Sequence, residues 1–170
     1  MKETAGLQKT EKRENNLSPR EKLLSFEKEG KFVFHGSARQ IETLEPRQPC
    51  IGKDEKHGDP CVATTPFVDI AIFRAIINED NFPQKTYSSS FGFDSDKGIE
   101  LHASQIVLDN LKDKKGFVYA LDKSLFKKFS GMEWRSEKTI KPNEVILVTA
   151  DDLPSGIKLI DKDFNPAKNE

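Results

Sequence analysis

The chain has 170 residues and carries 27 Lys and Arg against 28 Asp and Glu, so its formal net charge is -1. This length is enough for one domain with a substantial core, and the balanced charge excludes nucleic-acid binding through bulk positive charge. No apolar stretch approaches the roughly 20 residues that cross a bilayer, and residues 1–16 lack the apolar core of a signal peptide. We therefore expect a cytoplasmic protein with no membrane partner.

The first predicted element is a short helix. Ser18-Pro19-Arg20-Glu21 combines a capping serine, a proline at the first helical position and a glutamate at the third, which together form a capping box. We expect the helix to end at Gly30, because glycine is the common C-terminal cap. Lys31–His35 follows as a short strand by its composition.

The middle of the chain combines two long loops with one strong helix. Residues 36–60 contain several Pro and Gly residues and predict a loop, and residues 61–64 predict a second short strand. A helix over 66–78 begins at Thr65-Pro66. Five residues fall at helical spacing, and all but one are apolar: Phe67, Ile70, Ala71, Arg74 and Ile77. Residues 81–98 form the second long loop, which is rich in aromatic side chains.

Strands dominate the C-terminal part of the chain. Residues 104–112 predict a short helix, and the apolar run at 117–121 predicts a central strand. Residues 133–140 alternate loosely between polar and apolar. Residues 144–149 give the strongest strand signal, which we also expect to be central, and residues 157–160 form the last strand.

These elements predict a single α+β domain over residues 18–162, between a polar N-terminal tail at 1–17 and a polar C-terminal tail at 163–170. Two cysteines, Cys50 and Cys61, are too few for a disulfide framework. No spacing of Cys and His matches a zinc site, so we expect no metal held by the protein.

The sharpest local feature is His35-Gly36-Ser37 at the end of an apolar strand. Glycine lets a ligand approach the backbone closely, so the N–H and C=O of Gly36 can bind a planar amide with the Ser37 hydroxyl as a third partner. Taken alone, the tripeptide favours an ordinary turn with a capping histidine.

Three motifs that follow one another along the chain favour a ligand site over an ordinary turn. They are Phe34-His35-Gly36-Ser37 with Ile41 and Leu44 behind it, Gly58–Pro66 leading into the middle helix, and Asn143-Glu144 opening the strongest strand. Together they resemble the three motifs of the ADP-ribosyltransferase superfamily, particularly its poly(ADP-ribose) polymerase-like branch. The resemblance spans roughly Phe32 to Asp161. It implies a split mixed β-sheet core with a few flanking helices, and NAD as the substrate.

The resemblance also implies roles for individual residues. His35 would hydrogen-bond a hydroxyl of the nicotinamide ribose, and Gly36 with Ser37 would hold the nicotinamide carboxamide. Glu144 would bind the same ribose and stabilise the positive, oxocarbenium-like sugar as nicotinamide leaves, because a fixed carboxylate favours developing positive charge. The acceptor of the ADP-ribose, whether a protein, a nucleic acid or a small molecule, is not identified by these residues.

The middle motif departs from the family. By this resemblance Val62 occupies the position of a family tyrosine that stacks on nicotinamide. By resemblance Val62, Thr64 and Phe67 lie around the ligand, but the stacking ring has to come from elsewhere, with Phe67, Tyr87 and Phe91 as candidates.

Arg39 and Arg47 follow the first motif and can contact the NAD pyrophosphate, since Arg binds phosphate in a bidentate manner. The alternative is that they are solvated loop charges.

Two other functions are compatible with the same motifs. One is an RNA 2'-phosphotransferase, which shares the fold and would need several basic residues around the phosphate. The other is an inactive domain that binds NAD, ADP-ribose or a protein partner, and the missing tyrosine favours it.

Three glutamates are candidates for the charged catalytic group. Glu144 opens an apolar strand and matches the third motif. Glu133 and Glu137 belong to a charged stretch in which they can pair with Arg135 or Lys138 at the surface. We therefore predict Glu144 as the catalytic glutamate.

Overall fold

The computed structural model describes residues 17–48, 50–51, 55–56, 58–83 and 87–160. Apart from residue 17, the two tails expected from the sequence lie outside the described residues, as does the side chain of Cys50. Cys61 is a buried free thiol, and burial raises its pKa.

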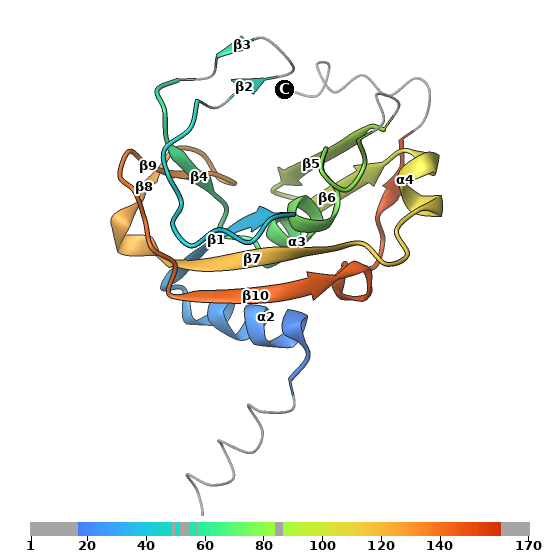
Figure 1. The fold of residues 1–170 in the computed structure, drawn as a ribbon, viewed down its shortest axis with the longest axis horizontal. Helices are drawn as coiled ribbons and strands as arrows, with labels where there is room; N and C mark the ends of the chain where they lie inside the picture. Colours follow the sequence, from blue (N-terminus) through green and yellow to red (C-terminus); the bar gives the residue numbers. More distant parts are fainter. Residues whose placement is uncertain (1–16, 49, 52–54, 57, 84–86, 161–170) are drawn as a thin grey trace, which may run out of the picture.

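The described chain is a mixed α+β structure (Figure 1). Its helices are α2 (Pro19–Glu29), α3 (Val68–Ile76) and α4 (Gln105–Asp109). Its strands are β1 (Phe32–Ser37), β2 (Cys50–Ile51), β3 (Glu55–Lys56), β4 (Val62–Thr64), β5 (Ser89–Asp94), β6 (Gly98–Ala103), β7 (Lys115–Asp122), β8 (Lys127–Lys128), β9 (Trp134–Ser136), β10 (Glu144–Thr149) and β11 (Lys158–Leu159).

The predicted caps of the first helix are confirmed. The Ser18 side chain accepts a hydrogen bond from the Glu21 N–H, while the Glu21 carboxylate accepts one from the Ser18 N–H. Gly30 closes the helix in the left-handed region with a φ of 68°, which glycine adopts without strain. Helix α2 then lies beneath the strands in Figure 1 and leads directly into β1.

The central sheet has the order β1-β7-β10, and both pairs are antiparallel. His35 and Val145 lie opposite Tyr119 from the two sides, and Phe34 and Glu144 lie opposite Ala120. Because side chains alternate across a strand, His35 and Glu144 belong to opposite faces of this sheet. The apolar cluster around α3 covers the Phe34 face, and a second cluster that includes Tyr119 covers the other.

Helix α3 packs closely on the central sheet. All its residues except Asp69 and Arg74 are buried, as its apolar pattern predicts. A side chain at Gly36 would overlap the Ala71 carbonyl oxygen, and one at Gly116 would overlap the Ala75 carbonyl oxygen. The two glycines therefore let the helix backbone approach strands β1 and β7, and the missing side chain of Gly36 makes room for the helix.

A second sheet, with the order β4-β9-β8, joins the central sheet at one point. Phe34 and Thr65 form a single antiparallel bridge, in which the Phe34 N–H donates to Thr65 at 2.7 Å and the Thr65 N–H donates back at 2.9 Å. Strands β9, β4 and β1 therefore follow one another in space. Beyond the bridge β1 and β4 are not paired.

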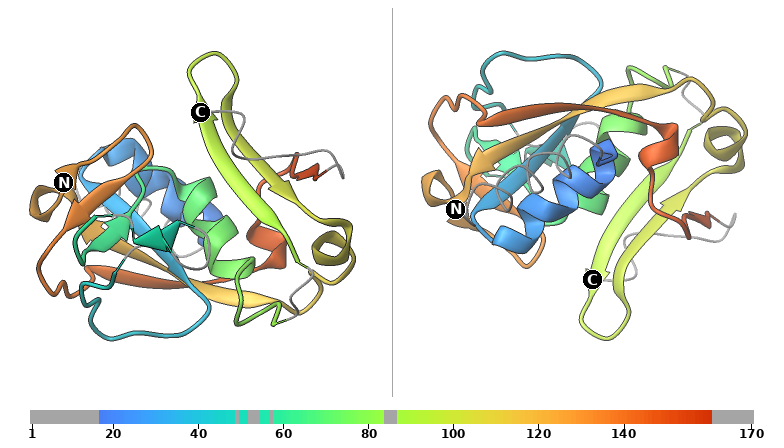
Figure 2. Two further views of the ribbon diagram at one scale, coloured as in Figure 1. Left: turned by 90° about the horizontal axis from the view of Figure 1, so that it is seen from above. Right: turned by 90° about the horizontal axis from the view of Figure 1, so that it is seen from below.

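The expected loop at 81–98 is wrong in its second half, because β5 and β6 form a hairpin. Strand β11 pairs with β6 in parallel. Figure 2 shows this hairpin projecting past α3. Gly98 has a φ of 78° at the turn, which suits a tight hairpin connection.

Three other expectations change. Strand β10 is an edge strand rather than a central one, and its Val145 and Leu147 are exposed. Strand β1 continues through Ser37 instead of ending at His35. The loop at 36–60 contains the short pair β2 and β3. The strand over 117–121 does lie centrally, within β7.

Candidate functional site

Two neighbouring cavities open beside β1. The first has a volume of about 560 Å³ and the second about 360 Å³. Four residues line both: His35, Ser37, Arg74 and Phe91. The polar side chains that line only the first cavity are Glu45, Arg47, Gln48, Glu133 and Arg135. Those that line only the second are Asn78, Glu79, Asp80, Tyr87 and Ser89.

The separation of β1 from β4 opens this site. If the ladder continued past the bridge of Phe34 with Thr65, Gly36 would lie opposite Ala63. Instead, the Ala63 carbonyl oxygen lies 2.9 Å from Nδ1 of His35. The imidazole thus takes the place of a ladder hydrogen bond between the two strands.

The backbone of Gly36 faces this gap. The N–H and C=O of Phe34 bond Thr65, and the Ala120 carbonyl bonds Asn143 rather than β1. The backbone N–H and C=O of Phe34 therefore point away from β7. In an antiparallel strand these groups point the same way at every second residue, so those of Gly36 share the direction of Phe34. The N–H and C=O of Gly36 consequently point away from β7, toward the second cavity that Gly36 lines.

His35 is neutral and has one fixed tautomer near pH 7. Burial, with smaller contributions from the charges of Arg74 and Arg47, lowers its pKa to about 4. A carbonyl oxygen can only accept, so Nδ1 carries the proton that bonds Ala63. Nε2 is then an unprotonated acceptor, which suits a hydroxyl donor of a ligand.

Glu133 shares the first cavity with His35. It directly precedes β9, and its Oε1 accepts a hydrogen bond from Nε of Arg135 at 2.6 Å. The Arg135 guanidinium lies over the ring of Phe129, 3.4 Å from the ring centre, and its side chain is 13% exposed. An ion pair and a ring contact therefore fix the position of the Glu133 carboxylate.

Glu144 does not join this site. It lies on the opposite face of the central sheet from His35 and forms an ion pair with Lys22 of α2 at 2.5 Å. The expectation that Glu144 and His35 hold one ribose therefore does not fit this arrangement. The physical reason is that β10 is two strands away from β1 and in a register that turns Glu144 toward α2.

The other expected ligand residues divide into two groups. Ser37 lines both cavities, and Val62 lines the first. Thr64 is buried and donates from Oγ1 to the Trp134 carbonyl, while Phe67 stacks on Phe93 at 5.0 Å. Neither Thr64 nor Phe67 is among the described residues that line the two cavities.

The two loop arginines also differ. Arg47 lines the first cavity. The Arg39 side chain is 76% exposed and bonds Asp80 of the second cavity at 2.6 Å. Arg39 itself is not among the described residues that line either cavity. Sequence reasoning missed Arg74, whose signal was its place as the single charged member of the apolar spacing in the middle helix.

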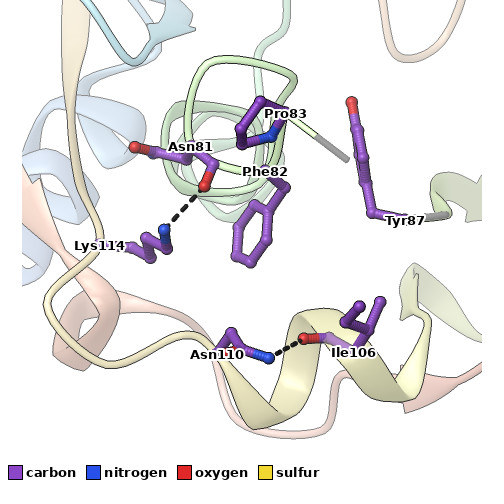
Figure 3. A pocket seen from close by; sticks show the side chains of 7 residues that line it. All are labelled: Asn81, Phe82, Pro83, Tyr87, Ile106, Asn110 and Lys114. Carbon is purple, nitrogen blue, oxygen red and sulfur yellow. Dashed lines mark hydrogen bonds between the residues drawn. The ribbon is translucent and has the colours of Figure 1, made fainter. Parts of the chain in front are cut away.

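A third, smaller pocket of about 140 Å³ lies between α4 and the segment after α3 (Figure 3). Its polar groups are engaged locally, because Lys114 Nζ donates to the Asn81 carbonyl and Asn110 donates to the Ile106 carbonyl. The Phe82 ring occupies its middle. This pocket carries no acid–base pair, and we assign it no function.

Within the described residues, no three His, Cys, Asp or Glu side chains gather where they could hold a metal ion. No described helix is both long and apolar enough to cross a membrane. Comparison of the chain with protein-family models, curated proteins and solved structures finds no match.

Proposed function

We propose that the protein is an NAD-dependent ADP-ribosyltransferase in which His35 and Glu133 act on one ribose. The bond between nicotinamide and C1' of that ribose breaks, and its electron pair leaves with the nicotinamide nitrogen. A nucleophile of the acceptor then bonds to C1' and loses its proton. The observation that carries the proposal is the first cavity, which a neutral histidine and an arginine-bound glutamate line together.

The strand order supports the proposal. The first two expected motifs lie on β1 and β4, which meet at the bridge of Phe34 with Thr65. Strand β9 pairs with β4 and follows directly on Glu133. A glutamate at the start of a late strand therefore stands beside the other two motifs, and we assign Glu133 the role that sequence reasoning assigned to Glu144.

The exposed edge of β1 supports recognition of the nicotinamide amide. The N–H of Gly36 can donate to the carboxamide oxygen, and its C=O can accept from the carboxamide NH₂. The Ser37 hydroxyl lies next to this pair in both cavities. A planar amide can match a neighbouring donor and acceptor in a way that a hydroxyl cannot.

His35 and Glu133 divide the chemistry. Nε2 of His35 accepts from a ribose hydroxyl and orients the sugar. The Glu133 carboxylate stabilises positive charge as it develops on the sugar, by an electrostatic effect that needs no rearrangement at the moment of bond breaking. Phe91 is the aromatic ring that lines both cavities, so it is the best-placed of the three candidate stacking residues.

A second reaction class, RNA 2'-phosphate transfer to NAD, is favoured by one observation. Arg47, Arg74 and Arg135 all line the first cavity, and converging guanidinium groups suit a phosphate. Arg135 is engaged with Glu133, however, so two arginines face the space. Supplying an oligonucleotide with an internal 2'-phosphate beside NAD separates the two reactions, because only this class removes the phosphate.

The test compares three glutamate variants at saturating NAD, with release of nicotinamide as the readout. Glu133→Gln should fold normally and lower turnover by at least about 100-fold, because the amide keeps the shape and loses the charge. Glu144→Gln and Glu137→Gln are matched controls and should stay within about twofold of the parent. Loss of turnover in Glu144→Gln with full turnover in Glu133→Gln would refute the assignment. Absence of nicotinamide release in the parent, with or without cell extract as acceptor source, would refute the enzyme class.

A further inference from the structure

A ligand that fills both cavities has to pass the four residues that they share. Of His35, Ser37, Arg74 and Phe91, only Arg74 carries a charge near neutral pH. The point at which the two halves of such a ligand join therefore lies beside a guanidinium.

Arg74 is not needed to finish its helix. It lies in the last turn of α3, where a cation can favour the helix dipole. The carbonyls of that turn already have partners, because Asn78 donates to the carbonyls of Arg74 and Ala75, and Asn81 donates to that of Ile76. The capping role of an arginine is thus filled by two asparagine side chains.

The guanidinium of Arg74 is held but not neutralised. It lies over the ring of Phe91, 5.5 Å from the ring centre. No described carboxylate approaches it within ion-pair distance, and no described acceptor bonds its nitrogens. Arg74 is an exposed residue that lines both cavities, and the protein atoms packed around its guanidinium lower its pKa. A guanidinium offers five N–H donors in a planar fork that matches phosphate oxygens.

We propose that Arg74, supported by the ring of Phe91, binds a pyrophosphate that bridges the two halves of a dinucleotide lying across both cavities. The inference rests on the proposed function for the identity of that dinucleotide as NAD. The other charged groups that line the cavities sit to either side: Glu45, Arg47, Glu133 and Arg135 in the first, and Glu79 and Asp80 in the second. In the first cavity two carboxylates are balanced by two arginines, and in the second Asp80 is paired with Arg39. Arg74 is therefore the charged group that a ligand meets in both cavities.

The experiment measures calorimetric binding of two probes, inorganic pyrophosphate and nicotinamide, to the parent and to variants. Arg74→Met keeps an apolar stem on Phe91 and should weaken pyrophosphate binding at least tenfold, while nicotinamide binding stays within twofold. Arg74→Lys keeps the charge without the fork and should bind pyrophosphate at least threefold more weakly than the parent. Lys112→Met removes an exposed charge on the turn before β7 and is the control that should bind as the parent does.

Pyrophosphate binding that is unchanged in Arg74→Met overturns the inference, as does a parent that binds no pyrophosphate at millimolar concentration. If Arg74→Met does not fold, Arg74→Lys decides, and parent-like affinity in that variant overturns the inference. Arg74-dependent pyrophosphate binding in a protein that never releases nicotinamide supports the phosphate site and counts against the proposed function. Turnover that depends on Glu133 but not on Arg74 supports the proposed function and overturns the phosphate site.

Discussion

The carboxylate of Glu133, just before β9, and the guanidinium of Arg135, within β9, are joined by a 2.6 Å hydrogen bond. Both residues line the cavity that His35 lines. Arg135 in turn lies against Phe129. The glutamate is therefore restrained by a chain of contacts that begins outside the cavity.

Arg135→Met should lower turnover without abolishing the charge of Glu133. The carboxylate loses its charge-assisted hydrogen bond, worth about 1.5–3 kcal/mol, and samples positions away from the ribose, so we expect a fall in kcat of roughly 10–100-fold. Arg135→Lys should recover part of that loss. Steady-state kinetics with NAD test this, and a purely structural role would instead raise KM, or lower the melting temperature, with an unchanged kcat.

Gly36→Ala should destabilise the fold as well as the ligand contact. A Cβ at this position overlaps the Ala71 carbonyl and reaches 2.8 Å from the Ala75 N–H. Both are helix backbone atoms that cannot move without shifting α3. We expect a loss of about 2–4 kcal/mol in the free energy of unfolding, which urea titration measures.

Gly92→Ala is the matched control for that substitution. Gly92 also lies in a strand, β5, but nothing lies within 4 Å of a Cβ built there. This variant should change the free energy of unfolding by less than about 1 kcal/mol. Equal destabilisation by the two substitutions would mean that the contact between α3 and β1 is looser than the structure has it.

The sequence predicted those helices whose caps or apolar spacing lie within the helix and the residues next to it. Ser18, Glu21 and Gly30 define α2 within the residues that they cap, and the apolar spacing of α3 needs only one helix face. The hairpin of β5 and β6 was missed because its polar and aromatic residues alternate weakly. Phe91 and Phe93 remain partly exposed even though they contact Arg74 and Phe67.

Sequence and structure agree on candidate residues where these belong to one segment: the contiguous His35, Gly36 and Ser37 all line the second cavity. The structure favours Glu133 over Glu144 because the arrangement depends on which strand pairs with β4, and a run of apolar residues does not encode that pairing. The alternation of Glu144 with buried Ile146 is visible in the sequence, but the face that it defines is fixed only by pairing with β7.

Arg74→Met should raise the pKa of His35. Burial is the main cause of the lowered pKa, but the nearby charge of Arg74 disfavours a second positive charge on the ring. Removing that charge leaves burial and Arg47, so the pKa should move upward while staying below its ordinary value of about 6.5. NMR titration of the histidine ring protons measures this, with Lys112→Met as the control. A His35 pKa that is identical in Arg74→Met and the parent would contradict the electrostatic contact.

The lowered pKa of His35 should make folding stability depend on pH below neutrality. The unfolded chain takes up a proton near pH 6.5, whereas the folded ring, with a pKa of about 4, does not. Between these two values the unfolded state binds more protons, so the free energy of unfolding falls as the pH drops through this window. The full difference is at most about 3.5 kcal/mol at roughly 1.4 kcal/mol for each pH unit. His35→Gln has no titrating ring and can still donate to the Ala63 carbonyl, so its stability should change less between pH 6.5 and 4 than that of the parent. Urea titrations at several pH values test this, and parallel curves for the parent and His35→Gln would show that His35 is not the group responsible.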